Sequence, residues 1–198
     1  MAYTTNAIPY GRRLLPSYLD EIAKTNPGRV YAAIPKTAAV EDGYMDVTIA
    51  DLARCANFMA QWIEERFGKS QNFETIAYVG LSDLRGVALF LAAIKTGYKL
   101  LLASPRNPAK SNLSLMEQTQ SSKLLYSAEL DPLINPFRAI APPSCHLAAV
   151  PSFLEMLQSN PKDYLFEKEF DESRYDPILV LHSSGSTGKL FSPFWFNN

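Results

Sequence analysis

The sequence predicts an α/β fold in which a mostly parallel sheet carries helices on both faces. From residue 70 onward, short apolar runs of strand length alternate with segments that have helical periodicity. These runs are apolar at nearly every position, which is typical of central strands that are covered on both sides. The last run, residues 177–181, leads directly into a loop of serine, threonine and glycine. Ligands of such sheets bind beyond the carboxyl ends of the strands.

The N-terminal part is expected to contain a helix followed by two short strands. Residues 14–24 predict the helix, which stops at Asn-Pro-Gly, residues 26–28. Residues 29–35 and 44–47 predict the strands, with a turn at residues 41–43 between them.

The clearest helix begins at Thr48, because Thr48 and Asp51 have the spacing of a capping box. It ends at Gly68. Apolar residues follow the start at steps of three and four: Ile49, Leu52, Ala53, Ala56, Met59, Ile63 and Phe67. This stripe predicts core packing and no ligand site.

The remaining chain alternates between strands and helices. The expected strands are residues 74–80, 98–103, 122–127, 146–150 and 177–181. The expected helices are residues 82–95 with Ser82 as the cap, a segment ending near Gln120, residues 131–138 and residues 151–158. Residues 160–176 are charged and are expected to form a surface loop, and Leu179 is expected to be buried.

Composition excludes several classes of function. The chain has 198 residues, 47% of them hydrophobic, and a net charge of −1, so it has no basic surface for nucleic acid or for an anionic membrane. The longest apolar run, Val87–Ile94, is far too short to span a bilayer. No secretory signal is evident, so we expect a cytoplasmic protein. The two cysteines and two histidines, Cys55, Cys145, His146 and His182, predict neither a disulfide framework nor a metal site.

The loop after the last strand carries the candidate site. Its residues are Ser183, Ser184, Gly185, Ser186, Thr187, Gly188 and Lys189. Glycines let the backbone approach a ligand closely, and the hydroxyl groups and the lysine can bind phosphate oxygens. The glycine spacing matches neither the P-loop nor the dinucleotide-binding fingerprint. The loop therefore predicts a phosphate or nucleotide site, with a flexible Ser/Gly turn as the alternative.

Three segments together resemble the adenylate-forming (AMP-dependent synthetase/ligase) superfamily. These are LHSSGSTGK (Leu181–Lys189), the block Ala77–Asn107 and the opening Gly11–Lys36. More narrowly, they are similar to the N-terminal part of the adenylation domain of fungal nonribosomal-peptide-synthetase-like enzymes of the carboxylic acid reductase type. The resemblance implies that residues 1–189 are a partial adenylation domain, an incomplete N-terminal portion of the large subdomain, and that residues 190–198 are a divergent tail.

The resemblance also implies a reaction. Such enzymes use ATP and Mg²⁺ to convert a carboxylic acid into an acyl-adenylate, and the acyl group then passes to a phosphopantetheine thiol on a carrier domain. Residues 183–188 occupy the positions that hold the phosphates. The family motif continues with Pro-Lys, where this chain has Leu190 and Phe191, and the tail that follows is apolar with no evident partner element.

Three hypotheses follow. The first is a truncated adenylation domain with little or no activity alone, because the rest of the family's site lies downstream. The second is a small phosphate- or nucleotide-binding module without chemistry. The third is a non-catalytic fragment. The catalytic residues, the acid and the oligomeric state are left open, and the expected partners are ATP and a carboxylic acid.

Overall fold

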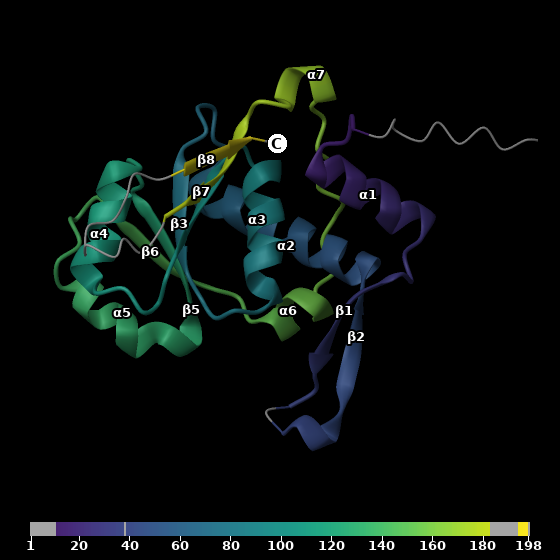
Figure 1. Ribbon diagram of the computed structural model, residues 1–198, viewed down its shortest axis with the longest axis horizontal. Coiled ribbons are helices and arrows are strands. Elements are labelled where there is room, and N and C mark those ends of the chain that lie inside the picture. The colour runs from purple at the N-terminus through teal and green to yellow at the C-terminus, as the bar shows by residue number, and fades with distance from the viewer. Residues whose placement is uncertain (1–10, 38, 183–193, 198) are drawn as a thin grey trace, which may run out of the picture.

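A six-stranded sheet forms the centre of the molecule, in the order β6-β5-β3-β4-β7-β8 (Figure 1). The computed structural model describes residues 11–37, 39–182 and 194–197. The strands are β3 (Thr75–Val79), β4 (Lys99–Ala103), β5 (Lys123–Ser127), β6 (His146–Val150), β7 (Pro177–Leu181) and β8 (Phe194–Asn197). Neighbouring strands are parallel except for β7 and β8, which are antiparallel. The predicted mostly parallel sheet is confirmed.

Helices cover both faces of this sheet. They are α1 (Leu15–Thr25), α2 (Ile49–Phe67), α3 (Leu84–Lys95), α4 (Ala109–Gln118), α5 (Asp131–Arg138), α6 (Phe153–Gln158) and α7 (Phe170–Ser173). Alternate side chains of β3 point to opposite faces. Ile76 and Tyr78 belong to the core under α2, α3 and α6, whereas Ala77 and Val79 belong to the core under α4 and α5. Helix α1 packs outside the first layer, with Leu19 against Leu52 and Leu91.

Local signals explain where the two central helices begin and end. The Thr48–Asp51 capping box is present, with the Asp51 N–H donating to Thr48 Oγ1 (3.2 Å), and α2 is followed by Gly68 at φ 73°. Helix α3 differs from the prediction, because its cap is Asp83 and not Ser82. The Asp83 carboxylate accepts from the Arg85 N–H (2.9 Å) and also pairs with the Arg85 guanidinium, an interaction that Ser82 cannot make.

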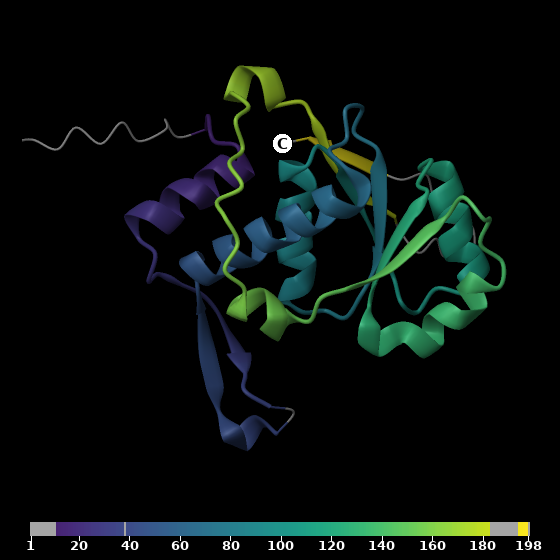
Figure 2. The ribbon, with the colours of Figure 1, turned by 180° about the vertical axis from the view of Figure 1, so that it is seen from behind.

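A separate hairpin extends from the body of the molecule (Figures 1 and 2). It consists of β1 (Val30–Pro35) and β2 (Tyr44–Thr48), which pair antiparallel, with the short 3-10 helix η1 (Val40–Asp42) between them. Val30, Tyr31, Val40, Tyr44 and Met45 are exposed on it. Both strands were predicted.

The charged stretch before β7 is less irregular than predicted. Residues 159–169, called the connector below, contain no helix or strand, but α7 follows and is capped by Glu169. Figure 2 shows the connector running from α6 across the helical layer to α7. Arg12 forms an ion pair with Asp171 and lies over the ring of Phe170, and these contacts join α7 to the chain before α1.

Two expectations about the C-terminal strands are wrong. Leu179 is only half-buried, whereas its neighbours Ile178 and Val180 are 9% and 0% exposed. The apolar tail has a partner element, because residues 194–197 pair with β7, with Leu181 opposite Phe194. This added strand covers an edge of β7 that would otherwise present unpaired backbone groups.

Candidate functional site

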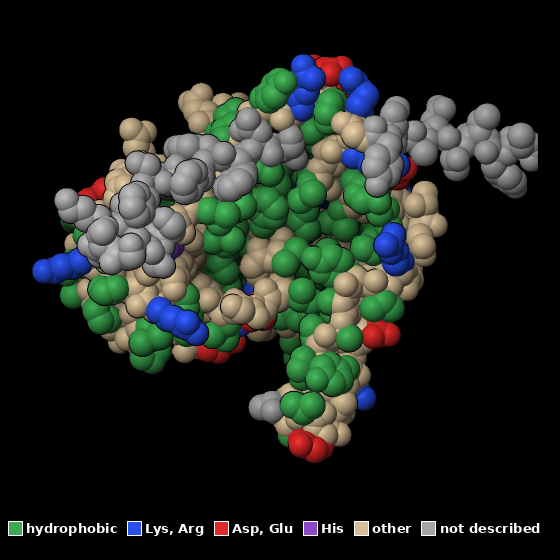
Figure 3. Space-filling model, in the orientation of Figure 1, with side chains coloured by type: hydrophobic (Ala, Val, Ile, Leu, Met, Phe, Trp, Pro, Cys, Tyr) green, Lys and Arg blue, Asp and Glu red, His purple; other side chains and the backbone are tan. Residues whose placement is uncertain are grey.

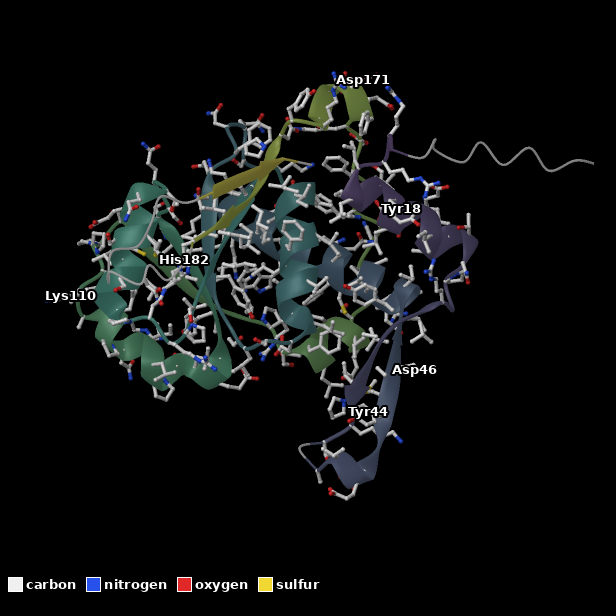
Figure 4. The ribbon with its side chains drawn as sticks, in the orientation of Figure 1. Tyr18, Tyr44, Asp46, Lys110, Asp171 and His182 are labelled. Carbon is white, nitrogen blue, oxygen red and sulfur yellow. The ribbon has the colours of Figure 1, made fainter. Side chains whose placement is uncertain are left out.

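The candidate site lies at the carboxyl ends of β3, β4 and β7. Strand β4 pairs with one side of β3 and β5 with the other, so the chain changes direction across the sheet at this point. In open α/β sheets, ligands bind in the crevice at such a switch point. His182 follows β7 directly (Figure 4). The predicted loop residues Ser183, Ser184, Gly185, Ser186, Thr187, Gly188 and Lys189 lie outside the described residues.

A cavity of about 600 Å³ is present at the ends of β3, β4 and β7, beside the switch point, which itself lies between β3 and β5. Its apolar wall includes Val87 and Phe90 of α3, Leu102 of β4 and Leu179 of β7. In the space-filling view, hydrophobic side chains form a band across the middle of the molecule, over α3 (Figure 3). The half-buried state of Leu179 follows from this cavity, because the side chain packs against the core on one side and lines the cavity on the other.

Polar lining residues come from the turns that follow the strands. Ser82 and Asp83 follow β3, Ser104 follows β4, and His182 follows β7. Serine hydroxyls can both donate and accept hydrogen bonds. The cavity therefore combines an apolar wall with polar groups at one end, which is the usual composition of a small-molecule site.

A buried hydrogen-bond network holds the turn after β3 in place. Tyr78 Oη lies 2.9 Å from Ser127 Oγ, which accepts a second hydrogen bond from the Leu81 N–H at 3.2 Å. Burial raises the pKa of the Tyr78 phenol, so the hydroxyl stays protonated. Gly80 is required beside the ring, since a Cβ there would lie 2.1 Å from the Tyr78 Cζ atom. The cavity wall at this turn is thus built on a rigid element.

Three charged side chains near the cavity form ion pairs with one another. Arg85 is 4% exposed and binds Asp83 (Nη2–Oδ2, 2.6 Å) and Glu129 (Nη1–Oε2, 2.9 Å). Burial opposes the charge of Arg85, but the hydrogen bonds to both carboxylates outweigh it and raise its pKa. The same contact with Arg85 lowers the pKa of Glu129. Arg85 is therefore a structural cation, and the Asp83 carboxylate is occupied by capping and pairing.

Among the described residues, the other reactive side chains do not assemble into a catalytic group. The Cys145 thiol has a pKa raised by burial, which disfavours a nucleophilic thiolate, and His146 lies on β6, remote from the cavity lining. In the described part of the chain, no three His, Cys, Asp or Glu residues are grouped to hold a metal ion. Within that part there is also no helix with the length and apolarity needed to cross a membrane.

A cavity at the carboxyl ends of parallel strands, in a sheet covered by helices on both faces, places the chain in the class of α/β domains. No protein-family profile matches the chain. The chain is 32% identical over 187 residues to a carboxylic acid reductase from Neurospora crassa, covering 91% of this chain and 17% of that protein. It is 28% identical over 183 residues to the isocyanide synthase–NRPS hybrid crmA from Aspergillus fumigatus, covering 92% and 12%.

Solved structures share the fold. The N-terminal domain of FACL13 from Mycobacterium tuberculosis has a TM-score of 0.72 at 20% identity, over 92% of this chain and 44% of that one. The nonribosomal peptide synthetase FmoA3, solved in an α-methyl-L-serine-AMP bound form, has a TM-score of 0.70 at 15% identity, over 96% and 18%. The chain thus resembles the N-terminal part of an adenylation domain of the adenylate-forming superfamily, and it shares the fold of that part. It spans less than one fifth of the two curated relatives.

Proposed function

We propose that this chain provides the phosphate-binding part of an ATP-dependent, acid-activating adenylation domain in the cytoplasm. In this proposal residues 1–189 are the partial AMP-binding domain and residues 190–198 are a divergent tail. The observation that carries the proposal is the cavity at the ends of β3, β4 and β7, immediately before the predicted loop Ser183–Lys189. The kinship with a carboxylic acid reductase supports a carboxylic acid as the second substrate.

The described residues fit the apolar part of such a ligand better than its phosphates. Phe90 and Val87 offer an apolar surface for a ring or an alkyl chain, and Ser82 and Ser104 offer hydroxyl groups. Among the described lining residues, the charge of Asp83 is balanced by Arg85. Backbone N–H groups and hydroxyls of residues 183–188, together with Lys189, would therefore bind the phosphates, with Mg²⁺ carried by the phosphates themselves.

Each part of the site then has a defined task. The rigid turn after β3 and the end of β4 would exclude water from one side of the ligand, and the loop would orient the phosphate chain. Bound ATP would supply the α-phosphorus that a carboxylate attacks, with pyrophosphate as the leaving group. In the longer relatives the acyl group would pass on to a phosphopantetheine thiol of a carrier domain.

We expect the chain alone to bind ATP or pyrophosphate weakly and to form no acyl-adenylate at a meaningful rate. Only interactions that strengthen in the transition state raise the rate. Groups that orient the carboxylate are expected in parts of the relatives that the match does not cover, and orientation alone can supply about 7–11 kcal/mol.

The test combines ATP titration with ATP–pyrophosphate exchange in the presence of aryl and α-keto acids. The Ser186→Ala/Thr187→Ala variant should lose phosphate binding. A matched variant, Thr25→Ala/Ser144→Ala, removes two exposed hydroxyl groups outside the cavity and should bind normally. Binding that is unchanged in the loop variant would contradict the loop assignment. Strong acid-dependent exchange by the parent, abolished in the loop variant, would contradict the expected inactivity.

A further inference from the structure

A buried ammonium group lies away from the cavity, at the end of α3. The Lys95 side chain is 0% exposed although lysine is almost never fully buried unless it is paired. Its Nζ lies 2.6 and 2.9 Å from the two carboxylate oxygens of Asp20, 2.9 Å from Asn57 Oδ1 and 2.8 Å from the Tyr164 carbonyl oxygen. These partners belong to α1, α2 and the connector.

The ammonium has as many N–H donors as there are segments around it, so it can donate one hydrogen bond to each of the three. A lysine ammonium has three N–H groups and accepts no hydrogen bond. One N–H shared between the two Asp20 oxygens leaves one for Asn57 and one for Tyr164. Burial lowers the pKa of Lys95, and the hydrogen bond to Asp20 opposes this effect. The charge is therefore kept by Asp20, and each segment receives one hydrogen bond from a charged donor.

The connector has further polar contacts besides those of Lys95. At its end, Lys168 Nζ lies 2.7 Å from Asp176 Oδ2 and 4.7 Å from the ring centroid of Phe73. Gln61 Nε2 of α2 donates to the Lys162 carbonyl oxygen at 2.8 Å, and Lys69 Nζ lies 5.1 Å from the ring centroid of Tyr164. The connector has no regular backbone hydrogen bonding of its own, so its path over the helices is set by such contacts. Lys95 is the deepest of these anchors, and it fixes the connector in the middle.

The connector in turn determines where β7 enters the sheet. Only α7 and a short turn separate it from β7, and β7 pairs with β4 through just two residue pairs, Leu100–Leu179 and Leu101–Val180. Lys95 also lies four residues before Lys99, where β4 begins. One side chain thus connects the end of α3, just before β4, with the segment that leads into β7.

We propose that Lys95 is a positioning residue that sets the place of β7, and through it the predicted phosphate loop that follows. The inference about the loop rests on the proposed function, whereas the inference about the connector and β7 does not. Without Lys95, the connector loses its central anchor. Strand β7 is then held by its short pairing with β4, by β8, and by the Lys168–Asp176 and Arg12–Asp171 ion pairs of the segment before it.

The first test is hydrogen–deuterium exchange of the full chain without nucleotide. Lys95→Met should increase exchange in residues 177–182 by about tenfold to a hundredfold, the value of one hydrogen bond from a charged donor, with β3 still protected. Lys24→Met is the matched control, because Lys24 is exposed on α1 beside the same connector, and it should leave this segment unchanged. Exchange of β7 in Lys95→Met that matches the parent would overturn the proposal for β7.

A second variant covers the case in which Lys95→Met fails to fold by leaving the partly buried Asp20 without a counter-charge. Asp20→Leu/Lys95→Met removes both charges and keeps similar volumes, which proteins often tolerate. This variant should keep its helical circular dichroism but show the same increased exchange in residues 177–182. Wild-type protection of β7 in a folded double variant would refute the anchor.

Chemical rescue separates the ammonium from simple packing. In Lys95→Ala, propylammonium replaces the missing atoms and should restore protection of β7, whereas 1-propanol fills the same space without charge and should not. Equal rescue by both would reduce Lys95 to a space-filling role. ATP titration of the same variants reports on the loop separately. A parent that binds no ATP would contradict the proposed function and leave the exchange result standing.

Discussion

Gly80 and Gly86 both lie against the ring of Tyr78, and we predict that alanine at these two positions changes the free energy of unfolding in opposite directions. A Cβ at Gly80 would lie 2.1 Å from both Cζ and Oη of Tyr78, so the ring would have to move. A Cβ at Gly86 would lie 3.8 Å from Tyr78 Cε1, which is ordinary van der Waals contact, and Gly86 is inside α3.

The structure gives the expected magnitudes. Tyr78 is 3% exposed, so the ring cannot move into solvent, and overpacking of this kind costs about 1–3 kcal/mol. Displacing the hydroxyl from Ser127 (2.9 Å) adds about 1 kcal/mol. We therefore expect Gly80→Ala to lower the free energy of unfolding by about 2–4 kcal/mol. Gly86→Ala should raise it by about 0.5–1 kcal/mol, because alanine is the better helix former.

Urea unfolding followed by far-UV circular dichroism measures both changes, provided that the m-value is unchanged. The variant Tyr78→Ala/Gly80→Ala identifies the cause, since the cost of Gly80→Ala should disappear once the ring is removed. A Gly80→Ala protein within about 0.5 kcal/mol of the parent would refute the reasoning. So would a cost that is the same with and without the Tyr78 ring.

Two further predictions concern the core. Val180→Asp, at a position that is 0% exposed, should lower the free energy of unfolding by about 3 kcal/mol or more. Leu179→Asp should lower it clearly less, because Leu179 lines the cavity. Equal losses of melting temperature in the two variants would contradict this orientation of β7. Burial raises the pKa of Cys55 from 9.0 to about 12. Since the unfolded chain loses this proton first, the contribution to stability is complete below pH 9 and is lost between pH 9 and about 12. In Cys55→Ala, the free energy of unfolding should therefore decrease less steeply between about pH 9 and about pH 11, by at most about 1.4 kcal/mol per pH unit. If urea titrations show the same slope in the variant and the parent, Cys55 is not the cause of this pH dependence.

The sheet and the long helix were predictable because their signals are local. The Thr48–Asp51 capping box and the apolar stripe of α2 require only neighbouring residues, and both are present in the structure. The start of α3 was misplaced by one residue, since Ser82 and Asp83 are both good caps. The choice between them depends on Arg85 and Glu129, and Glu129 lies 44 residues away from Arg85 in sequence.

The strand that leads into the predicted loop could be predicted from the sequence, but the cavity beside it could not. The apolar run before the Ser/Gly loop indicated a strand end, which the structure confirms at Leu181. The cavity could not be predicted, because it arises between α3 and the ends of three strands that are distant in sequence. The same cause explains the error at Leu179. An apolar side chain that lines a cavity and one that packs in a core have the same sequence signature.

Lys95 shows why the remaining contacts escape a reading of sequence alone. A lysine in the last turn of a helix has a sufficient local explanation, because a cation there is favoured by the helix dipole and is ordinarily solvated. Its actual role requires Asp20, 75 residues earlier, and the Tyr164 carbonyl, 69 residues later. A backbone carbonyl leaves no trace in the sequence at all, since every residue has one. The anchor of the connector is therefore visible only after α1, α2 and α3 have been packed together.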